Sequence, residues 1–434
     1  MTGRHPYQPL LNPQGQVAEA KYLYDILLGK MLQPEPHTPN DRVVPYLRAA
    51  NIQWAGVRTE DIANMYASPR EIDACSVVPG DLLVCEGGEV GRAAVCPSML
   101  PPETIIQNAV HRVRVKNGNS TRYLGYLLRH IANSGWFDVL CNKATIAHFT
   151  VEKFGDLLLG YPSPKIQESI ADFLDKETSR LDSLLGEKQR FLNLLAEKRR
   201  TLIASSITQG LNRDAQRRDS GIPWLGEIPA HWNILRAKVL FREIDERSDT
   251  GEEVLLSLRI TKGLVPHNDV SEKVITPADL IGYKKAWPQQ IVINRMRAAS
   301  GLIAVVPQAG LVSPDYAVFE SVGEVNPEFF TYLFQTPLLQ AVFRSESKGL
   351  GTGQSGFLRL YSENFLALHM PAPPIEEQKL ILQWVQTETK KIDDFAQATE
   401  RTITLLQERR SALISAAVTG QLKIDVSASE VATA

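Results

Sequence analysis

The stretch that decides the fold runs from Gln167 to Leu211, QESIADFLDKETSRLDSLLGEKQRFLNLLAEKRRTLIASSITQGL. It returns from Gln378 to Leu422 as QKLILQWVQTETKKIDDFAQATERTITLLQERRSALISAAVTGQL. The two copies align without a gap at a constant offset of 211 residues and are identical at 14 of 45 positions. Self-similarity at a fixed distance indicates a duplicated structural unit. We therefore predict that the chain of 434 residues consists of two similar halves.

Each copy contains no proline, and its aliphatic residues recur at intervals of seven and four. This seam predicts one long helix per copy that pairs with another helix, because apolar residues at this spacing fall on one face. At about 1.5 Å per residue each helix could reach roughly 65 Å; two ordinary amphipathic core helices are the alternative. The residues expected to pack the helix pair are Leu174, Leu181, Leu185, Leu192, Leu195, Leu202, Val385, Ile392, Ile403, Leu406 and Leu413.

A module of short β-rich runs, separated by turn residues, precedes each long helix. Residues 78–84 and 287–293 are matching strands, residues 123–128 and 329–334 are matching short helices, and prolines close both modules. The expected organisation is a first module over 1–163, a long helix over 164–212, a second module over 213–372, a second long helix over 373–424 and a flexible tail over 425–434.

The composition is that of a globular protein, with 44% hydrophobic and 22% charged residues. The net charge of −2 excludes a uniformly basic nucleic-acid coat but allows local basic patches. The sequence has no apolar run near the roughly 18 residues of a membrane span and no signal-peptide pattern at its start, so a cytoplasmic location is expected. Cys75, Cys85, Cys96 and Cys141 have no paired CxxC spacing and are expected to be buried core residues.

Further motifs follow one another in a distinctive order. Trp224-Leu225-Gly226-Glu227-Ile228-Pro229-Ala230-His231-Trp232 opens the second module, Gly80-Asp81-Leu82-Leu83-Val84 precedes a glycine-rich turn, and Pro373-Pro374-Ile375-Glu376-Glu377-Gln378 opens the second long helix. The long helices end on Ile207-Thr208-Gln209-Gly210-Leu211 and Val418-Thr419-Gly420-Gln421-Leu422. With these motifs, over nearly its whole length, the chain resembles the specificity subunits of type I DNA restriction–modification enzymes.

The resemblance implies an α+β fold: two target-recognition domains of mixed α/β structure, separated by two long antiparallel coiled-coil helices in a pseudo-twofold internal repeat. It implies that each domain reads one half of a bipartite double-stranded DNA target. It further implies that the helices dock two methyltransferase (modification) subunits, and through them the restriction and translocase subunits of an antiviral defence system. The subunit itself would be non-catalytic. The first module departs from the pattern, since a helix-like segment over 18–28 replaces the Trp-Leu-Gly-Glu-Ile-Pro opening.

Local basic windows agree with DNA as a partner. Residues 104–137 and 280–314 contain several cations and no acid, which suits surfaces that face phosphates. Glycine-rich stretches over 86–92 and 348–356 let a backbone approach bases closely, and by the 211-residue offset Gln354 falls on Lys143 and Arg359 on His148. The candidate DNA-binding residues are Arg92, Arg112, Arg114, Lys116, Lys143, His148, Lys284, Lys285, Arg295, Arg297, Lys348, Gln354 and Arg359. The alternatives are solvated strand residues and hairpin loops without contacts.

Neither a catalytic residue nor a metal or cofactor is expected. The glycine-rich stretches are not followed by Gly-Lys-Ser/Thr, Gly-x-Gly-x-x-Gly is missing, and the eight histidines are scattered. Pro314-Asp315 begins like a nuclease motif, but a lysine is missing two residues after Glu320. Asn326-Pro327-Glu328-Phe329 differs from the Asn-Pro-Pro-Tyr motif of the family's methylating partner. The alternative function is a tandem-module coiled-coil scaffold that binds only proteins.

Overall fold

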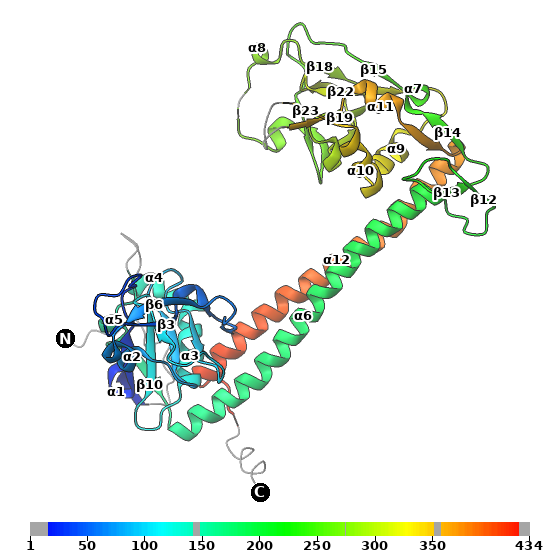
Figure 1. Cartoon of the computed structure of the whole chain (residues 1–434). Helices are drawn as coiled ribbons and strands as arrows, with labels where there is room; N and C mark the ends of the chain where they lie inside the picture. Colours follow the sequence, from blue (N-terminus) through cyan, green and yellow to red (C-terminus); the bar gives the residue numbers. More distant parts are fainter. Residues whose placement is uncertain (1–15, 142–147, 274, 351–356, 425–434) are drawn as a thin grey trace. The chain divides into compact units, whose positions relative to one another are not determined.

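The computed structural model describes residues 16–141, 148–273, 275–350 and 357–424 (Figure 1). The chain divides into two compact units: unit 1 comprises Met1–Gln189 with Arg401–Ala434, and unit 2 comprises Arg190–Glu400. Both units combine strands and helices, in agreement with the predicted α+β class. The tail expected over 425–434 lies outside the described residues.

Unit 1 is built on an antiparallel four-stranded sheet in the order β2 (Tyr24–Leu28), β10 (Val110–Val115), β7 (Leu82–Cys85), β8 (Ala93–Val95). Helix α3 (Thr121–Asn133) covers it, because its buried face, including Leu124 and Leu128, packs on Leu82, Val84 and Val113. Strand β1 (Gln16–Glu19) pairs with β11 (Leu158–Tyr161), and α4 (Trp136–Leu140) and α5 (Val151–Gly155) complete the layer.

The prediction of a helix over residues 18–28 is wrong. Only α1 (Ala20–Leu23) is helical, and it lies between strands β1 and β2. The reason is tertiary: the backbone from Gln16 onward pairs with β11, and that from Tyr24 onward pairs with β10. Ladder hydrogen bonds and the burial of Leu23 and Tyr24 outweigh a local helical pattern.

A second core in unit 1 lies behind the sheet. Strand β3 (Arg42–Leu47) lies between β6 (Ala63–Ala67) and β9 (Ile105–Ile106), and the hairpin of β4 (Ile52–Gln53) and β5 (Gly56–Val57) and helix α2 (Pro69–Cys75) adjoin them. Three of the four cysteines are buried in this core and Cys141 is buried in the first; all four are free thiols. The cysteines are core residues, as predicted.

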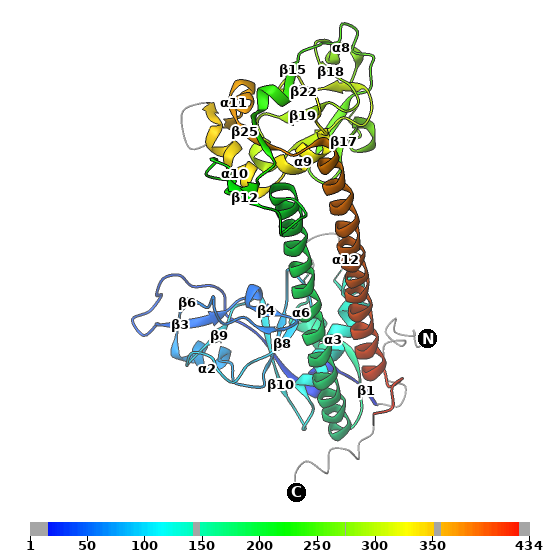
Figure 2. The same ribbon diagram turned by 90° about the vertical axis from the view of Figure 1, so that its right-hand side faces the viewer.

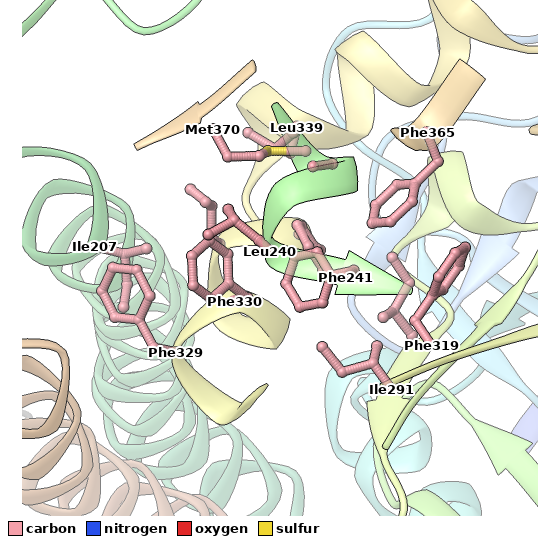
Figure 3. Close-up of a cluster of buried hydrophobic side chains, with 14 of the residues drawn as sticks. Ile207, Leu240, Phe241, Ile291, Phe319, Phe329, Phe330, Leu339, Phe365 and Met370 are labelled. Carbon is pink, nitrogen blue, oxygen red and sulfur yellow. The ribbon is translucent and has the colours of Figure 1, made fainter. Parts of the chain in front are cut away.

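Unit 2 repeats the plan of unit 1. Its four-stranded sheet has the order β15 (Phe241–Ile244), β22 (Tyr316–Ser321), β19 (Ile291–Asn294), β20 (Ile303–Val305), and β14 (Asn233–Arg236) pairs with β25 (His369–Ala372). Around it lie α7 (Ala237–Leu240), α8 (Pro277–Leu280), α9 (Pro327–Phe334), α10 (Pro337–Glu346), α11 (Ser362–Ala367), β12 (Arg217–Asp219) and β13 (Glu227–Pro229). Figure 3 shows the aromatic core, in which Phe241 meets Phe330 edge to face and Phe319 packs against Phe365.

Smaller strand pairs lie beside this sheet. The hairpin of β16 (Leu256–Arg259) and β17 (Gly263–Pro266), the pair β18 (Lys284–Ala286) and β21 (Gly310–Val312), and the hairpin of β23 (Lys348–Leu350) and β24 (Phe357–Arg359) are each antiparallel. Leu256, Leu258 and Leu264 bury the first hairpin against the back of the sheet. Unit 2 therefore also has two cores.

The predicted match between residues 78–84 and 287–293 holds in detail. The Asp81 carboxylate accepts a hydrogen bond from the Val78 backbone N–H at 2.8 Å, and the Gln290 side-chain oxygen accepts one from Trp287 N–H at 2.8 Å. The residues before them, Gly80 and Gln289, both have positive φ, at 90° and 70°. Two different sequences thus make the same turn into a central strand.

The long helices are α6 (Pro164–Gln209) and α12 (Ile375–Val418), which run side by side (Figures 1 and 2). In unit 1, Arg410 Nε donates to Asp182 at 2.8 Å; in unit 2, Arg199 Nε donates to Asp393 at 3.0 Å. A late residue of one helix meets an early residue of the other in both pairs, so the helices are antiparallel, as predicted. The two ion pairs are also copies of each other, because the 211-residue offset relates both aspartates and both arginines.

The residues named for the helix seam are buried or partly buried. Leu174, Leu181, Leu195, Val385 and Ile392 are buried. The partly buried members are Leu185, Leu192, Leu202, Ile403, Leu406 and Leu413. The adjacent repeat-equivalent leucines Leu194 and Leu405 are instead 61% and 63% exposed. Among the described helices, none combines the length and the apolar character that crossing a membrane requires.

A repeated glutamine fixes the start of each long helix. In unit 1, Gln167 accepts from Ser120 N–H at 2.9 Å and donates to the oxygens of Pro162 and Asn119, both at 2.9 Å. In unit 2, Gln378 accepts from Asn326 N–H at 2.9 Å and donates to Pro373 O at 2.8 Å. Both side chains are buried, so each ties a long helix to its module through hydrogen bonds shielded from water.

Candidate nucleic-acid interface

The loop that leaves the central strand meets the residue just before a short helix in both units. In unit 1 the Phe149 N–H donates to Glu86 O at 2.8 Å; in unit 2 the Leu360 N–H donates to Arg295 O at 2.9 Å. Phe149 and Leu360 are related by the 211-residue offset. His148 and Arg359, which precede them, therefore occupy equivalent positions, as the offset predicts.

These two equivalent residues have different chemistry. His148 is exposed and lies beside Gly87, where a side-chain carbon added to the glycine would be 3.6 Å from the imidazole Nδ1. Arg359 is partly buried, with its guanidinium 3.5 Å from Asp315 and 5.6 Å from the centre of the Tyr361 ring. A difference at matched positions is what two domains that read different sequences require.

The cations in the basic window of unit 1 largely form hydrogen bonds and ion pairs inside the domain. Arg112 is 5% exposed and donates to Ala74 O at 2.7 Å and Ser76 O at 2.9 Å. Arg114 makes two hydrogen bonds to Asp81, at 2.8 and 3.0 Å. The window is free of acids in sequence but not in space, because Asp81, in the turn directly before the neighbouring strand β7, pairs with Arg114. We therefore withdraw Arg112 as a DNA contact: its charge is buried and its hydrogen bonds are made.

The window of unit 2 shows the same effect. Lys284 is 2% exposed and lies 3.2 Å from Asp245, so it too is withdrawn as a DNA contact. Arg295 pairs with Glu243 at 3.0 Å, and Lys285 lies 3.4 Å from Glu246. These acids stand about 40 to 50 residues earlier in the chain and reach the window through sheet pairing.

The glycine-rich loop of unit 1 is held by a small network. Arg92 bonds Glu89 at 2.9 Å and Ala49 O at 2.9 Å, so its charge supports the loop from inside. Glu89 also accepts a hydrogen bond from the Trp54 indole at 2.6 Å, and the Arg129 guanidinium lies 5.4 Å from the Trp54 ring centre. Sequence spacing gave no signal for this link, because the hairpin and the loop are 35 residues apart.

Three of the named cations, Lys116, Arg297 and Lys348, lie at the surface. Lys116 reaches Lys21 O at 3.2 Å. For Arg297 and Lys348 no side-chain partner is present among the described residues. Lys143 and Gln354 lie outside the described residues.

The structure adds a group that the sequence analysis missed. Arg259 of the β16–β17 hairpin and Arg297 both lie near the Tyr316 hydroxyl, whose pKa is raised by burial and pulled the other way by these cations. Ser257, Arg259, Tyr283, Ser313 and Tyr316 line a cavity of about 220 Å³ at this place. In the sequence, this group could have been recognised from Arg259 and Lys262, two cations that flank a tight turn.

Comparison with known proteins shows which proteins this chain is similar to. The family described as the type I restriction modification DNA specificity domain matches residues 33–190. The putative type I restriction enzyme MjaX specificity subunit of Methanocaldococcus jannaschii is 21% identical over 320 residues, which cover 71% of this chain and 70% of that protein.

Solved structures share the fold. A chain from a structure described as "Structural basis underlying complex assembly and conformational transition of the type I R-M system" matches with a TM-score of 0.69 at 14% identity, covering 94% of this chain and 99% of that one. The HsdS subunit of Thermoanaerobacter tengcongensis matches with a TM-score of 0.55 at 16% identity, covering 95% and 98%. Over residues 33–190 the chain thus matches a type I restriction modification DNA specificity domain, and over most of its length it shares the fold of an HsdS subunit.

Proposed function

We propose that this chain directs a type I restriction–modification complex to a bipartite DNA sequence, with one half read by each unit. The observation that carries the proposal is the duplicated module with unlike residues at its equivalent loop positions, His148 in unit 1 and Arg359 in unit 2. A scaffold that binds only proteins would have no need for this difference.

Affinity and specificity would come from different residues. Exposed cations such as Lys116, Arg297, Lys348 and Arg259 would contact phosphates, while His148 and Arg359 would face base edges in the major groove. Arg114, Lys285, Arg295 and Arg92 would support this surface through their internal ion pairs and hydrogen bonds. Lys143 and Gln354 stay candidates for base contacts on sequence grounds.

The long helices would dock two methyltransferase subunits and, through them, the nuclease and translocase. The exposed Leu194 in unit 2 and Leu405 in unit 1 are copies of one residue, and a large apolar side chain at the same exposed position of two helices suits two equal docking sites. Helix length would also set the spacing between the half-sites. Inserting about four residues adds ~6 Å, so we expect the recognised spacer to lengthen by one or two base pairs at ~3.4 Å each.

The test is a selection of random duplexes bound by the chain together with its methyltransferase subunits. We expect enrichment of two short sequences with a fixed gap, and binding that weakens steeply with salt as phosphate-bound cations are displaced. Exchanging the 140–149 and 351–360 segments between the units should exchange or merge the two half-sites. Binding without sequence enrichment, or enrichment of one uninterrupted sequence, would refute the proposal.

A further inference from the structure

The Arg359 side chain of unit 2 keeps its hydrogen-bond donors unused, unlike the cations that the domains hold internally. Arg112 donates to two backbone oxygens and Arg295 donates to Glu243, whereas Arg359 makes no hydrogen bond to any of the described residues. Its Nε is buried without a partner there, and 22% of its side chain is exposed. A guanidinium with unused donors is able to bind a partner outside the chain.

The backbone that carries this side chain is fixed on both sides. Arg359 ends strand β24, where it is paired with Lys348 of β23, and the next residue, Leu360, donates its N–H to Arg295 O at 2.9 Å. Leu360 is 2% exposed, so the junction belongs to the core. Directly opposed residues of an antiparallel pair share one face, so Lys348 places a second cation beside Arg359. The guanidinium therefore starts from a defined position.

Two residues restrict the orientation of the guanidinium itself. Arg359 Nη1 lies 3.5 Å from Asp315 Oδ1, and the guanidinium carbon lies over the Tyr361 ring, 5.6 Å from its centre. Asp315 stands in the turn between β21 and β22, where Pro314 restricts the backbone and the Asp315 N–H donates to Ser313 Oγ at 3.3 Å. A carboxylate at one nitrogen and an aromatic ring beside the group together favour one orientation.

Unit 1 lacks all three members of this group. In the two sheets Val110 pairs with Cys85 as Tyr316 pairs with Asn294, so the residues before Val110 and Tyr316 are equivalent. The 211-residue offset relates the other two positions. The residues of unit 1 at these positions are Ala109 for Asp315, His148 for Arg359 and Thr150 for Tyr361. Where the arginine is absent, the carboxylate and the ring are absent too, so the three residues form one functional set.

The surface around this set is positive. Three exposed cations adjoin it: Arg259, Arg297 and Lys348. The first two lie near the hydroxyl of Tyr316, the residue that follows Asp315. Asp315 is already paired with Arg359, and the nearby Glu243 is paired with Arg295. The exposed cations therefore remain for the phosphates on either side of a base.

We propose that Arg359 reads a guanine in the half-site of unit 2, and that Asp315 and Tyr361 are positioning residues that hold its guanidinium for this contact; the inference rests on the proposed function. Two parallel N–H donors of a guanidinium match the O6 and N7 acceptors of guanine in the major groove. Adenine carries an amino donor in place of O6, so a fixed guanidinium rejects it. Because the guanidinium has five N–H donors, an ion pair at Nη1 leaves the two that guanine needs.

The test is a selection of random duplexes by the full chain together with its methyltransferase subunits. For the unaltered chain we expect a guanine at one position of one half-site, preferred over adenine by roughly 10- to 100-fold. Arg359→Lys keeps the charge but not the paired donors, so this preference should be lost while the slope of log affinity against log salt stays unchanged. The other half-site should be selected as before, which also shows that the variant is folded.

A second arm addresses the positioning residues. Asp315→Asn keeps the size of the side chain and removes its charge, so it should reduce the guanine preference by roughly three- to tenfold. It should not weaken DNA binding overall, because a negative charge leaves the surface. Tyr361→Leu should also reduce the preference, whereas Tyr361→Phe retains the ring and should keep it. The matched control is Asp249→Asn, since Asp249 is an exposed aspartate of unit 2 without an ion pair among the described residues.

The outcomes separate this inference from the proposed function. If the unaltered chain selects no sequence, the proposed function itself fails. If it selects two half-sites and Arg359→Lys changes no guanine preference, the assignment of Arg359 is overturned. If Asp315→Asn leaves the guanine preference intact, or instead removes a preference for cytosine at another position, Asp315 does not position Arg359 and the inference is wrong.

Discussion

Replacing Gln167 with leucine should lower the opening free energy of unit 1 and leave that of unit 2 unchanged. The change leaves the Ser120 N–H, the Pro162 oxygen and the Asn119 side-chain oxygen without their partner, all three at 2.9 Å and buried in the native chain. An unsatisfied buried polar group costs about 1–3 kcal/mol, partly offset by the apolar burial of leucine. We expect a net loss of about 2–4 kcal/mol of opening free energy, equal to roughly 30- to 700-fold in an equilibrium constant.

Hydrogen–deuterium exchange followed by mass spectrometry is the suitable assay, since a chain of two units need not unfold in one step. Exchange should accelerate by that factor in β10 and α3 and stay unchanged in the sheet of unit 2. The equivalent change Gln378→Leu should accelerate exchange in unit 2 instead, and by less, because its third hydrogen bond, to Glu324 O, is 3.4 Å long.

Gln189→Leu is the matched control on the same helix. Its side chain is exposed, so a change within about 0.5 kcal/mol is expected. If Gln167→Leu accelerated exchange no more than this control, or equally in both units, the glutamine would not anchor the helix and the reasoning would be wrong.

Three other perturbations test the surface, the loop and the pH response. Arg297→Ala and Lys348→Ala should each weaken DNA binding for all sequences and reduce the slope of log affinity against log salt by about 0.9; an unchanged slope would place these residues off the phosphates. Gly91→Ala should destabilise unit 1 strongly in thermal unfolding, because φ at Gly91 is +76° and the new carbon would lie 2.1 Å from the ring of Phe137. The control Gly88→Ala also has a positive φ, but its new carbon meets no atom, so it should lower the free energy of unfolding by only about 1 kcal/mol. Burial lowers the pKa of His111, so the unfolded chain binds the proton more tightly and unit 1 should lose stability as pH falls below about 6.5. His111→Gln should flatten that dependence in denaturation midpoints between pH 7 and 5, and an equally steep profile in the variant would assign the loss to other groups.

The fold was largely predictable from a few repeated residues. The 211-residue offset, the absence of proline and the seven-residue spacing predicted two long helices, and the family resemblance implied that they are antiparallel; the Asp182–Arg410 and Asp393–Arg199 pairs have that arrangement. These signals are local and periodic, so they survive in a single sequence. The segment over 18–28 was mispredicted, because its strands depend on partners about 90 and 140 residues away.

The candidate site was less predictable for the same reason. A window free of acids in sequence appeared to offer free cations, yet Asp81 and Glu243 reach Arg114 and Arg295 across the sheet. The hairpin cation Arg259 was overlooked, because its proximity to Tyr316 exists only after folding. Charge counted along a chain does not show which charges are neutralised in space.

The sequence by itself determined the duplication and the helical nature of its two long segments, since these follow from periodic apolar residues and from identical residues at one offset. Only the tertiary structure decided which cations reach the surface and which are held by carboxylates. The physical reason is range: helical periodicity acts over a few residues, whereas ion pairs and burial depend on side chains that strand pairing brings together from distant parts of the chain.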